Sequence, residues 1–339
     1  MSPQEPPGRR VSVVMPILDE ESHLEDAVAM VLRQDWDGDL EVVLALGPSS
    51  DRTDEVAERL AREDARVRLV ANPSGRTPDA LNAAVAASRG EVVVRVDGHA
   101  GIPEDYVSTA VRVLEETGAD TVGGVMDARG VTRFQRAVAA AMRSPLGVGA
   151  SRFHTGGDAG PVDTVYLGVF RRSALERVGG YDRRFTRTQD WELNHRIRAS
   201  GGVVWFTPEL LVTYRPRSGM RALARQYRDY GRWRRVVAGL HDGTVSLRYL
   251  AAPTMVLGTS AATLVGVVWA PALAVPAAYV LAVTVGGVLI TPGEEWRVRA
   301  LAGPVVATMH WSWGWGFLTS RPRRLLGDVP PQDPAATGG

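Results

Sequence analysis

Hydrophobic and polar positions form a repeating pattern over the first 210 residues. Short apolar runs bounded by turn residues are typical of strands buried on both faces of a parallel sheet. A helix is expected in each interval between them. The expected strands are 11–15 (ending at Pro16), 40–46, 67–71 and 91–96, and the expected helices are 20–33, 51–63 and 79–88. This alternation predicts an α/β fold with a mostly parallel, Rossmann-like sheet, whose ligands bind beyond the carboxyl ends of the strands.

The pattern changes after residue 249. No charged residue occurs between Leu250 and Ile290. A helix needs about 20 apolar residues to cross a bilayer, and the stretch divides naturally near Pro271. The pattern therefore predicts a transmembrane hairpin of two helices, roughly 250–269 and 272–290. The alternative, a buried soluble hairpin, requires two long uncharged helices that are packed on all sides.

A third apolar stretch, 300–320, contains His310 and three tryptophans and precedes a short run of arginines. Tryptophan favours the membrane–water interface, and arginines before the hairpin and after this stretch belong on the cytoplasmic side under the positive-inside tendency. Three full crossings would place the arginines before the hairpin and those after this stretch on opposite sides of the membrane. We therefore expect a hairpin plus a re-entrant or interfacial segment in a multi-pass protein of the cytoplasmic membrane, with the preceding α/β domain facing the cytoplasm. The amino terminus lacks the apolar stretch of a secretory signal, which agrees with this orientation.

Composition narrows the chemistry. The chain has no cysteine, which excludes disulfides, zinc–thiolate sites and thiol nucleophiles, so that a metal would have to be held by Asp, Glu or His. All 39 basic residues are arginines, and eight of them lie between 215 and 235 beside a single acid, Asp229. Nucleic acid or a membrane surface could pair with such a run. The adjoining hairpin favours membrane lipids, and no nucleic-acid partner is expected.

These observations predict a series of domains along the chain. The expected order is a disordered amino terminus (1–10), an α/β domain (11–214), a basic amphipathic interfacial region (215–249), the membrane segment (250–320) and a disordered tail (321–339).

Polar residues cluster where the predicted strands end. Asp19 and Glu20 follow the first strand, and the run Ser49, Ser50 and Asp51 follows the second. Asp51 could also simply cap the next helix.

The fourth strand delivers Asp97 and His99 at its carboxyl end. We expect them at the same edge of the sheet as the residues after the first two strands. Both side chains could ligate one Mg²⁺ or Mn²⁺ ion. The alternative is a turn in which Asp97 caps backbone amides and His99 lies on the surface.

Five motifs in order resemble the family-2 glycosyltransferases over about 235 residues, and in particular the succinoglycan-biosynthesis type with membrane segments after the catalytic domain. The motifs are VSVVMPILDE at 11–20, SSDRT at 49–53, ALNAA at 80–84, DGH at 97–99 and QDWE at 189–192. The resemblance implies a GT-A fold and a transferase that moves a sugar from a nucleotide-diphosphate sugar with inversion. It also implies a Mn²⁺ or Mg²⁺ cofactor.

The resemblance also implies residue roles. Asp97 would bind the metal and the diphosphate, with His99 in place of the family's second aspartate, and Asp190 would be the catalytic base. Asp190 could also cap the helix that runs to Ser200, either in place of the base role or together with it. The expected donor-binding residues are Pro16, Asp19, Glu20, Ser49, Asp51, Asn82, Asp97 and Arg232, with Asn72 and Arg76 as possible neighbours of the same pocket. The expected acceptor-side residues are Gln189, Trp191, Glu192, Gln226 and Trp233.

Several features depart from the family pattern. The segment Ala45–Ser49 lacks the aspartates that usually recognise the nucleotide base, and the usual Glu-Asp pair reads Gln189-Asp190. Gln226 and Arg232-Trp233 resemble the glutamine…arginine-tryptophan motif of membrane-embedded members at a wider spacing, which disfavours processive polymerisation. Asn82 could be a structural amide, and an interfacial helix would also place Arg232 and Trp233 where they are.

The main hypothesis is a metal-dependent transferase with a nucleotide-sugar donor and a lipid-linked or polysaccharide acceptor at the membrane. One alternative is a polyprenyl-phosphate monoglycosyltransferase. Another is a non-catalytic nucleotide-sugar-binding scaffold of a polysaccharide export complex.

Overall fold

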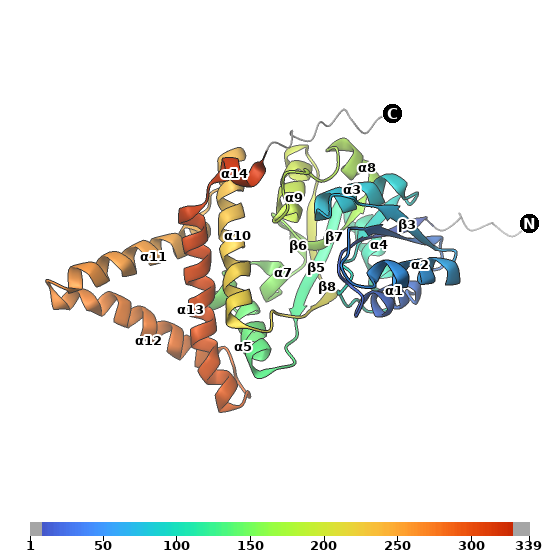
Figure 1. Ribbon diagram of the computed structural model, residues 1–339. Coiled ribbons are helices and arrows are strands. Elements are labelled where there is room, and N and C mark those ends of the chain that lie inside the picture. Colours follow the sequence, from blue (N-terminus) through green and yellow to red (C-terminus); the bar gives the residue numbers. More distant parts are fainter. Residues whose placement is uncertain (1–8, 328–339) are drawn as a thin grey trace, which may run out of the picture. The chain divides into compact units, whose positions relative to one another are not determined.

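The computed structural model describes residues 9–327, which form two compact units (Figure 1). The sheet unit contains residues 9–126 and 156–213, and the helical unit contains residues 127–155 and 214–327. The sheet unit differs in one respect from the α/β domain expected at 11–214, because residues 127–155 belong to the helical unit. The expected disorder at 1–8 and from residue 328 onward lies outside the described residues.

The sheet unit is built on one sheet of eight strands within the described residues, in the order β3-β2-β1-β4-β7-β5-β8-β6. The strands are β1 (Val11–Ile17), β2 (Leu40–Leu46), β3 (Val67–Ala71), β4 (Val92–Arg95), β5 (Thr121–Ala128), β6 (Gly160–Pro161), β7 (Tyr166–Arg171) and β8 (Val204–Tyr214). Strands β1 to β4 pair in parallel, as predicted. The pairs β4–β7, β5–β7 and β6–β8 are antiparallel. The sheet is therefore mixed, because the strands after residue 96 do not continue the β–α alternation.

Two apolar clusters cover the two faces of the sheet. Side chains alternate between faces along a strand, so that Val13 belongs to one cluster and its neighbour Val14 to the other. Helices α1 (Leu24–Leu32), α2 (Thr53–Glu63) and α4 (Tyr106–Thr117) contribute to the first cluster. Helices α3 (Thr77–Ala87), α8 (Arg172–Arg177) and α9 (Gln189–Ala199) contribute to the second. This core fixes β1, β2 and β4 side by side, which brings their carboxyl ends together.

The first predicted helix begins four residues later than expected. The chain after β1 turns at Asp19, whose φ of 54° lies in the left-handed region. Aspartate tolerates this conformation better than most residues do. The segment 18–23 is therefore a loop at the sheet edge, and α1 starts only at Leu24.

The helical unit contains the remaining helices. They are α5 (Arg133–Met142), α6 (Pro145–Val148), α7 (Arg152–Thr155), α10 (Met220–Leu240), α11 (Leu247–Gly266), the 3₁₀ helix η1 (Ala270–Leu273), α12 (Ala274–Leu289), α13 (Trp296–Thr319) and α14 (Pro322–Leu326). Helices α10 and α13 lie side by side (Figure 1). Their backbones touch at two glycines, because a Cβ atom on Gly231 would lie 2.0 Å from the carbonyl oxygen of Trp313 and one on Gly316 would lie 2.1 Å from that of Arg228.

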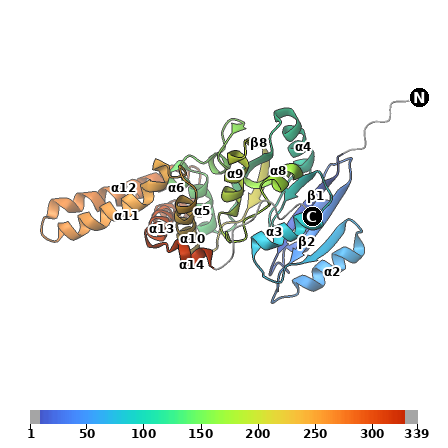
Figure 2. The same cartoon turned by 90° about the horizontal axis from the view of Figure 1, so that it is seen from above.

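Helices α11 and α12 form a hairpin joined by η1 (Figure 1 and Figure 2). Helix α11 and the segment Ala270–Leu289 are long and apolar enough to cross a membrane, judged by length and composition. A soluble hairpin would be buried on all sides. Instead, Leu257 is 58% exposed and Leu281 is 64% exposed.

The structure bears on two expectations for the end of the chain. The stretch expected to be re-entrant or interfacial belongs to one continuous helix, α13, without the reversal of direction that a re-entrant segment has, so that only the interfacial alternative stays a prediction. The tail expected to be disordered from residue 321 begins with a short helix, α14. Proline at its first position favours a helix start, because that residue's missing N–H would be unpaired there anyway.

Candidate active site

The loops after β1 and β2 are joined by hydrogen bonds. The Asp19 amide donates to Ser49 Oγ over 3.1 Å, and the Ser50 amide donates to Asp19 Oδ1 over 2.7 Å. The Glu20 amide donates to Thr53 Oγ1 over 2.8 Å. The strand-end residues therefore do meet at one sheet edge, as the parallel pairing predicted. Pro16 belongs to β1, opposite Ala45 of β2.

Asp51 has local partners in the same loops. Its Oδ1 accepts from the Thr53 amide over 3.0 Å, and its Oδ2 accepts from the Glu21 amide over 3.2 Å. These hydrogen bonds lower the pKa of the Asp51 carboxyl, the Thr53 hydroxyl contributing most. Helix α2 has Arg52 at its N-cap position, so that the interpretation of Asp51 as the cap is wrong. Asp51 instead fastens the loop after β1 to the turn before α2.

The loop after β4 brings His99 to Glu20. His99 Nδ1 lies 2.6 Å from Glu20 Oε1, and Gly98 packs against the Glu20 side chain, where a Cβ atom would come within 3.0 Å of Glu20 Cγ. Asp97, Glu20 and His99 are therefore neighbours at the edge.

The centre of the site is an arginine that sequence analysis did not single out. Arg95 closes β4, and its side chain is only 4% exposed. Its Nε and Nη2 donate to Asp97 Oδ1 over 3.1 and 3.0 Å, and its Nη1 donates to Asp190 Oδ1. A buried charge is costly unless it is paired. The signal available in the sequence was the single arginine inside the run VVVRVD.

Asp190 lies in the first turn of α9, but it does not cap the helix. The N-cap is Thr188, and no side chain makes a capping hydrogen bond. Burial raises the pKa of the Asp190 carboxyl above its ordinary value, Arg95 opposes that rise, and the charge of Asp97 adds to it. The alternative interpretation of Asp190 as a helix cap is therefore wrong.

Thr188 itself is strained. Its φ of 59° lies in the left-handed region, which β-branched residues rarely adopt. Such outliers are concentrated at functional sites. Here the strained residue sits directly before the turn that carries Gln189 and Asp190.

The donor atoms at the edge are compatible with a divalent cation held jointly by protein and substrate. Within residues 9–327 there is no group of three or more His, Cys, Asp or Glu side chains that could hold a metal alone. Asp97 Oδ1 is used by Arg95, while Oδ2 makes no hydrogen bond within the described residues. Mg²⁺ is commonly bound through one or two carboxylates plus substrate phosphates. Asp97 with the nearby His99 fits that type of site.

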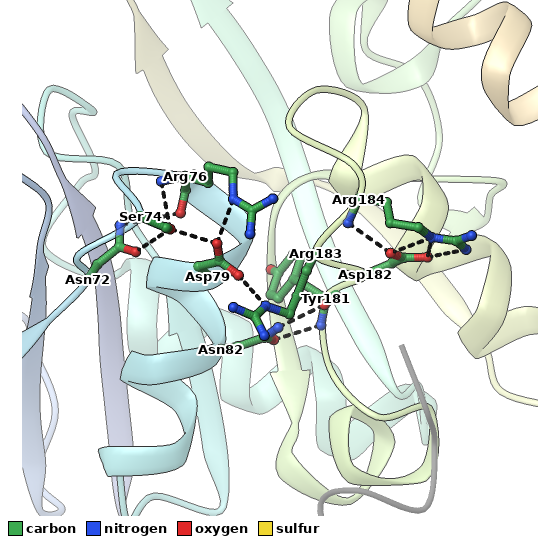
Figure 3. Close-up of polar contacts among 9 residues, drawn as sticks. All are labelled: Asn72, Ser74, Arg76, Asp79, Asn82, Tyr181, Asp182, Arg183 and Arg184. Atoms are coloured by element: carbon green, nitrogen blue, oxygen red, sulfur yellow. Dashed lines mark hydrogen bonds and ion pairs between the residues drawn. The ribbon is translucent and has the colours of Figure 1, made fainter. Parts of the chain in front are cut away.

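A second polar network joins helix α3 to the loop after α8 (Figure 3). Asp79 accepts from Ser74 Oγ over 2.6 Å, from Arg76 Nε over 2.7 Å and from Arg183 Nε. Asn82 Nδ2 donates to the Tyr181 carbonyl over 2.7 Å, and Asn82 Oδ1 accepts from the Tyr181 amide over 2.8 Å.

This network bears on two expected donor-pocket residues. The contacts of Asn82 are those of a structural amide, the alternative left open by the sequence. Asn72 is buried next to the same network, where its Oδ1 accepts from Ser74 Oγ over 2.9 Å.

The expected acceptor-side residues of α9 have different environments. Glu192 is 1% exposed, and both its oxygens accept hydrogen bonds of 2.7 Å from Arg196. The ring of Trp191 stacks on that of His195, with centroids 5.3 Å apart. Gln189 is the first residue of the helix.

The remaining expected residues lie on α10 of the helical unit. Gln226 Nε2 donates to the hydroxyls of Tyr214 and Tyr230 over 2.8 and 2.9 Å. Arg232 Nη1 donates to Asp229 Oδ1 over 3.2 Å, and Trp233 is buried.

The mixed sheet and the polar site at its edge are typical of the GT-A fold, which binds nucleotide sugars. Sequence comparison agrees with this assignment. The profile of glycosyl transferase family 2 matches residues 12–179. The succinoglycan biosynthesis protein ExoA of Rhizobium meliloti (strain 1021) is 33% identical over 308 residues, which cover 90% of this chain and 93% of that protein. The chain belongs to glycosyl transferase family 2, and it is a glycosyltransferase.

Two further similarities were found. A Methanococcus voltae dolichyl N-acetyl-alpha-D-glucosaminyl phosphate 3-beta-D-2,3-diacetamido-2,3-dideoxy-beta-D-glucuronosyltransferase is 21% identical over 65% of this chain and 71% of that protein. The solved structure of the mannosyltransferase PcManGT from Pyrobaculum calidifontis, in complex with GDP-Man and Mn²⁺, superposes with a TM-score of 0.58 at 21% identity. That superposition covers 89% of this chain and 86% of the other, and it confirms the GT-A fold.

Proposed function

We propose that this chain transfers a sugar, with inversion, from a nucleotide-diphosphate sugar to an acceptor at the cytoplasmic face of a membrane. The arrangement around Arg95 carries the proposal. One guanidinium occupies Oδ1 of both Asp97 and Asp190, and Oδ2 of both carboxylates makes no hydrogen bond within residues 9–327. The transfer needs one carboxylate on the donor side and one on the acceptor side. The cluster offers one of each.

Asp190 is the general base in this proposal. Its Oδ2 takes the proton of the acceptor hydroxyl while the acceptor oxygen forms a bond to the anomeric carbon. The bond from that carbon to the diphosphate breaks, and its electron pair leaves with the nucleoside diphosphate. The raised pKa of the Asp190 carboxyl supports this role, because a base works best when its pKa approaches the working pH.

Asp97 and the strand-end residues form the donor side. A bound Mn²⁺ or Mg²⁺ ion would neutralise charge on the leaving diphosphate, and Asp97 Oδ2 with His99 would hold it. Asp19, Glu20, Ser49 and Asp51 line the edge where the donor's base and ribose would lie.

Arg95 is a positioning residue in this scheme. Its guanidinium is planar and presents its donors in a fixed fork. It therefore sets the separation and the orientation of the two carboxylates before either substrate binds. It also offsets the repulsion between the two negative charges.

The acceptor is proposed to be lipid-linked or a growing polysaccharide. Three observations support this: the exposed apolar surface of α11 and α12, the succinoglycan-pathway relative, and the relative named for a dolichyl-linked substrate. Polysaccharide biosynthesis at the membrane is the process proposed.

The test is sugar transfer by membranes that contain the protein, offered UDP-, GDP- and dTDP-sugars with Mn²⁺ or Mg²⁺. We expect one donor to be consumed and chelation by EDTA to abolish its consumption. Asp190→Asn should lower turnover by at least about a hundredfold, the lower range for loss of a general base. Asp97→Ala should also lower turnover strongly, because it removes a ligand of the proposed metal ion.

The outcomes separate the alternatives. Radiolabel that enters a lipid as a single sugar would identify a polyprenyl-phosphate monoglycosyltransferase instead. If a donor binds to the wild-type protein and to Asp190→Asn but neither consumes it, the protein is a scaffold and the proposal is overturned.

A further inference from the structure

Helix α10 carries a stripe of arginines along one face. Arg221, Arg225, Arg228, Arg232 and Arg235 follow one another at alternating steps of four and three residues. That spacing places side chains on the same side of a helix. The stripe is therefore a continuous positive surface rather than an even distribution of charge.

Within the described residues, Arg232 is the one arginine of the stripe that has an acidic partner. Arg232 pairs with Asp229, and the guanidinium of Arg235 lies 5.3 Å from the ring centre of Phe317. Within residues 9–327, Arg221, Arg225 and Arg228 make no ion pair or side-chain hydrogen bond. Their charge is available to an anion from outside the chain.

Two of these arginines line a hollow against α13. It measures about 370 Å³, and its walls are Ala224, Arg225, Arg228, Trp311, Ser312 and Trp315. Trp311 is 37% exposed and Trp315 is 53% exposed. Positive charge on one wall and indole rings on the other suit a ligand that joins an anionic group to an apolar body.

Trp311 also lines a second hollow of about 280 Å³ between α11, α12 and α13. Its walls are mainly apolar, and they include Pro276 and Val280 of α12 and Ala307 of α13. The two hollows thus share one residue. Trp311 therefore borders both the hollow that contains the arginines and the hollow beside the candidate membrane helices.

We propose that this pair of hollows binds one membrane phospholipid. Its phosphate lies between Arg225 and Arg228, and an acyl chain passes Trp311 into the crevice between α11 and α12. Arginine suits phosphate because its fork of donors matches phosphate oxygens. A soluble nucleotide would use the arginines but would leave the apolar crevice unused, which is why the lipid is the better occupant.

The inference rests on the proposed membrane placement of α11 and α12 but not on sugar transfer. The test uses the full chain in a neutral detergent, with phosphatidylglycerol added and no sugar donor present. Native mass spectrometry counts the lipid molecules retained by each protein. Because no sugar donor is present, a negative result in this lipid-binding experiment does not bear on the proposed sugar transfer. The two proposals can therefore be refuted independently.

The test variant is Arg225→Gln/Arg228→Gln, and its matched control is Arg217→Gln/Arg221→Gln. Both pairs remove two charges from the same basic segment, but the control pair lies outside the hollow. We expect the affinity of the test variant for phosphatidylglycerol to be about thirtyfold lower than that of wild type, since each arginine near an anionic lipid raises the affinity roughly fivefold. The control should stay close to wild type. Trp315→Ala, which keeps every charge and alters a surface side chain, should also weaken retention.

Three results would overturn the proposal. Equal losses in the test and control variants would mean diffuse charge attraction without a built site. Retention unchanged in all variants would place the lipid elsewhere. Displacement of phosphatidylglycerol by a much lower concentration of undecaprenyl phosphate would assign the hollows to a lipid-linked substrate.

Discussion

Arg95 and Asp190 are 95 residues apart in the chain, yet Nη1 of the first donates to Oδ1 of the second. The same guanidinium also holds Asp97, so that one buried cation serves two carboxylates. Breaking a buried ion pair by removing one partner leaves the other charge unpaired, which is strongly destabilising. Removing Arg95 should therefore act mainly through the unpaired charges of Asp97 and Asp190, and less through the lost packing of its side chain.

Replacing Arg95 by glutamine should move the pH dependence of transfer. Arg95 lowers the Asp190 pKa against the effect of burial, so its loss raises that pKa further. A base must be deprotonated to act, and activity falls as the pH drops through its pKa. The acid limb of the pH–rate profile should consequently shift to higher pH in Arg95→Gln.

The matched control for that experiment is Arg172→Gln. Arg172 is partly buried, and it donates to the Gly90 carbonyl and to Ser88 Oγ away from the carboxylates. It should lose stability without any shift of the acid limb. If Arg95→Gln lowers the rate equally at every pH, Arg95 acts on geometry alone.

Glu192→Gln should damage folding rather than acceptor binding. Glu192 is buried, and both its oxygens are held by Arg196. Removing one partner of a buried pair costs roughly 3–5 kcal/mol of unfolding free energy, and the partial exposure of Arg196 places the expectation at the lower end. Thermal unfolding in detergent measures this loss. Unchanged stability with a raised KM for the acceptor would instead put Glu192 in contact with the acceptor.

Thr188→Gly should stabilise the protein. A β-branched residue at positive φ costs roughly 1–3 kcal/mol, and glycine adopts this conformation freely at an entropic cost of about 0.5–1 kcal/mol. The net gain should be roughly 1 kcal/mol in unfolding free energy. A fall in turnover alongside the gain would show that the strain holds Asp190 in its working position. Destabilisation by this substitution would mean that the threonine side chain contributes more than its strain removes.

Gly316→Ala should destabilise the helical unit, and Gly239→Ala should not. A Cβ atom on Gly316 would lie 2.1 Å from a backbone oxygen of α10, whereas one on Gly239 would meet nothing within 4 Å. Overpacking costs about 1–3 kcal/mol, and alanine at an open helical site gains up to about 1 kcal/mol over glycine. The two substitutions should therefore change the unfolding temperature in opposite directions. Equal shifts would mean that α10 and α13 separate easily.

The sequence predicted the parts of the fold that depend on local patterns. Strands β2 and β3 have their predicted bounds, and the meeting of Asp19 with Ser49 followed from the parallel pairing of their strands. The role of Arg95 was hidden, because an arginine in a strand ordinarily indicates a solvent-facing position. That the Arg95 side chain is buried becomes evident only in the folded structure, where α9 brings Asp190 to it.

The last long helix shows the same limit. Histidine, glycines and a proline in 300–320 weakened the helical signal, and the segment was expected to be re-entrant or interfacial. The structure extends a continuous helix from Trp296 to Thr319. Contacts with α10 and α12 supply the stability that local propensity lacks.

The pairing of α10 with α13 also imposes an order on biosynthesis. Ribosomes add about 5–20 residues each second, so that the chain from the end of α10 to the end of α13 takes on the order of ten seconds to make. During that interval the face of α10 at Gly231, which contacts the backbone of α13 in the finished protein, lacks its partner helix. A nascent chain interrupted before Trp296 would leave this face of α10 open to chaperones and proteases. A chain that stops before α13 should accordingly be degraded faster than the full-length chain.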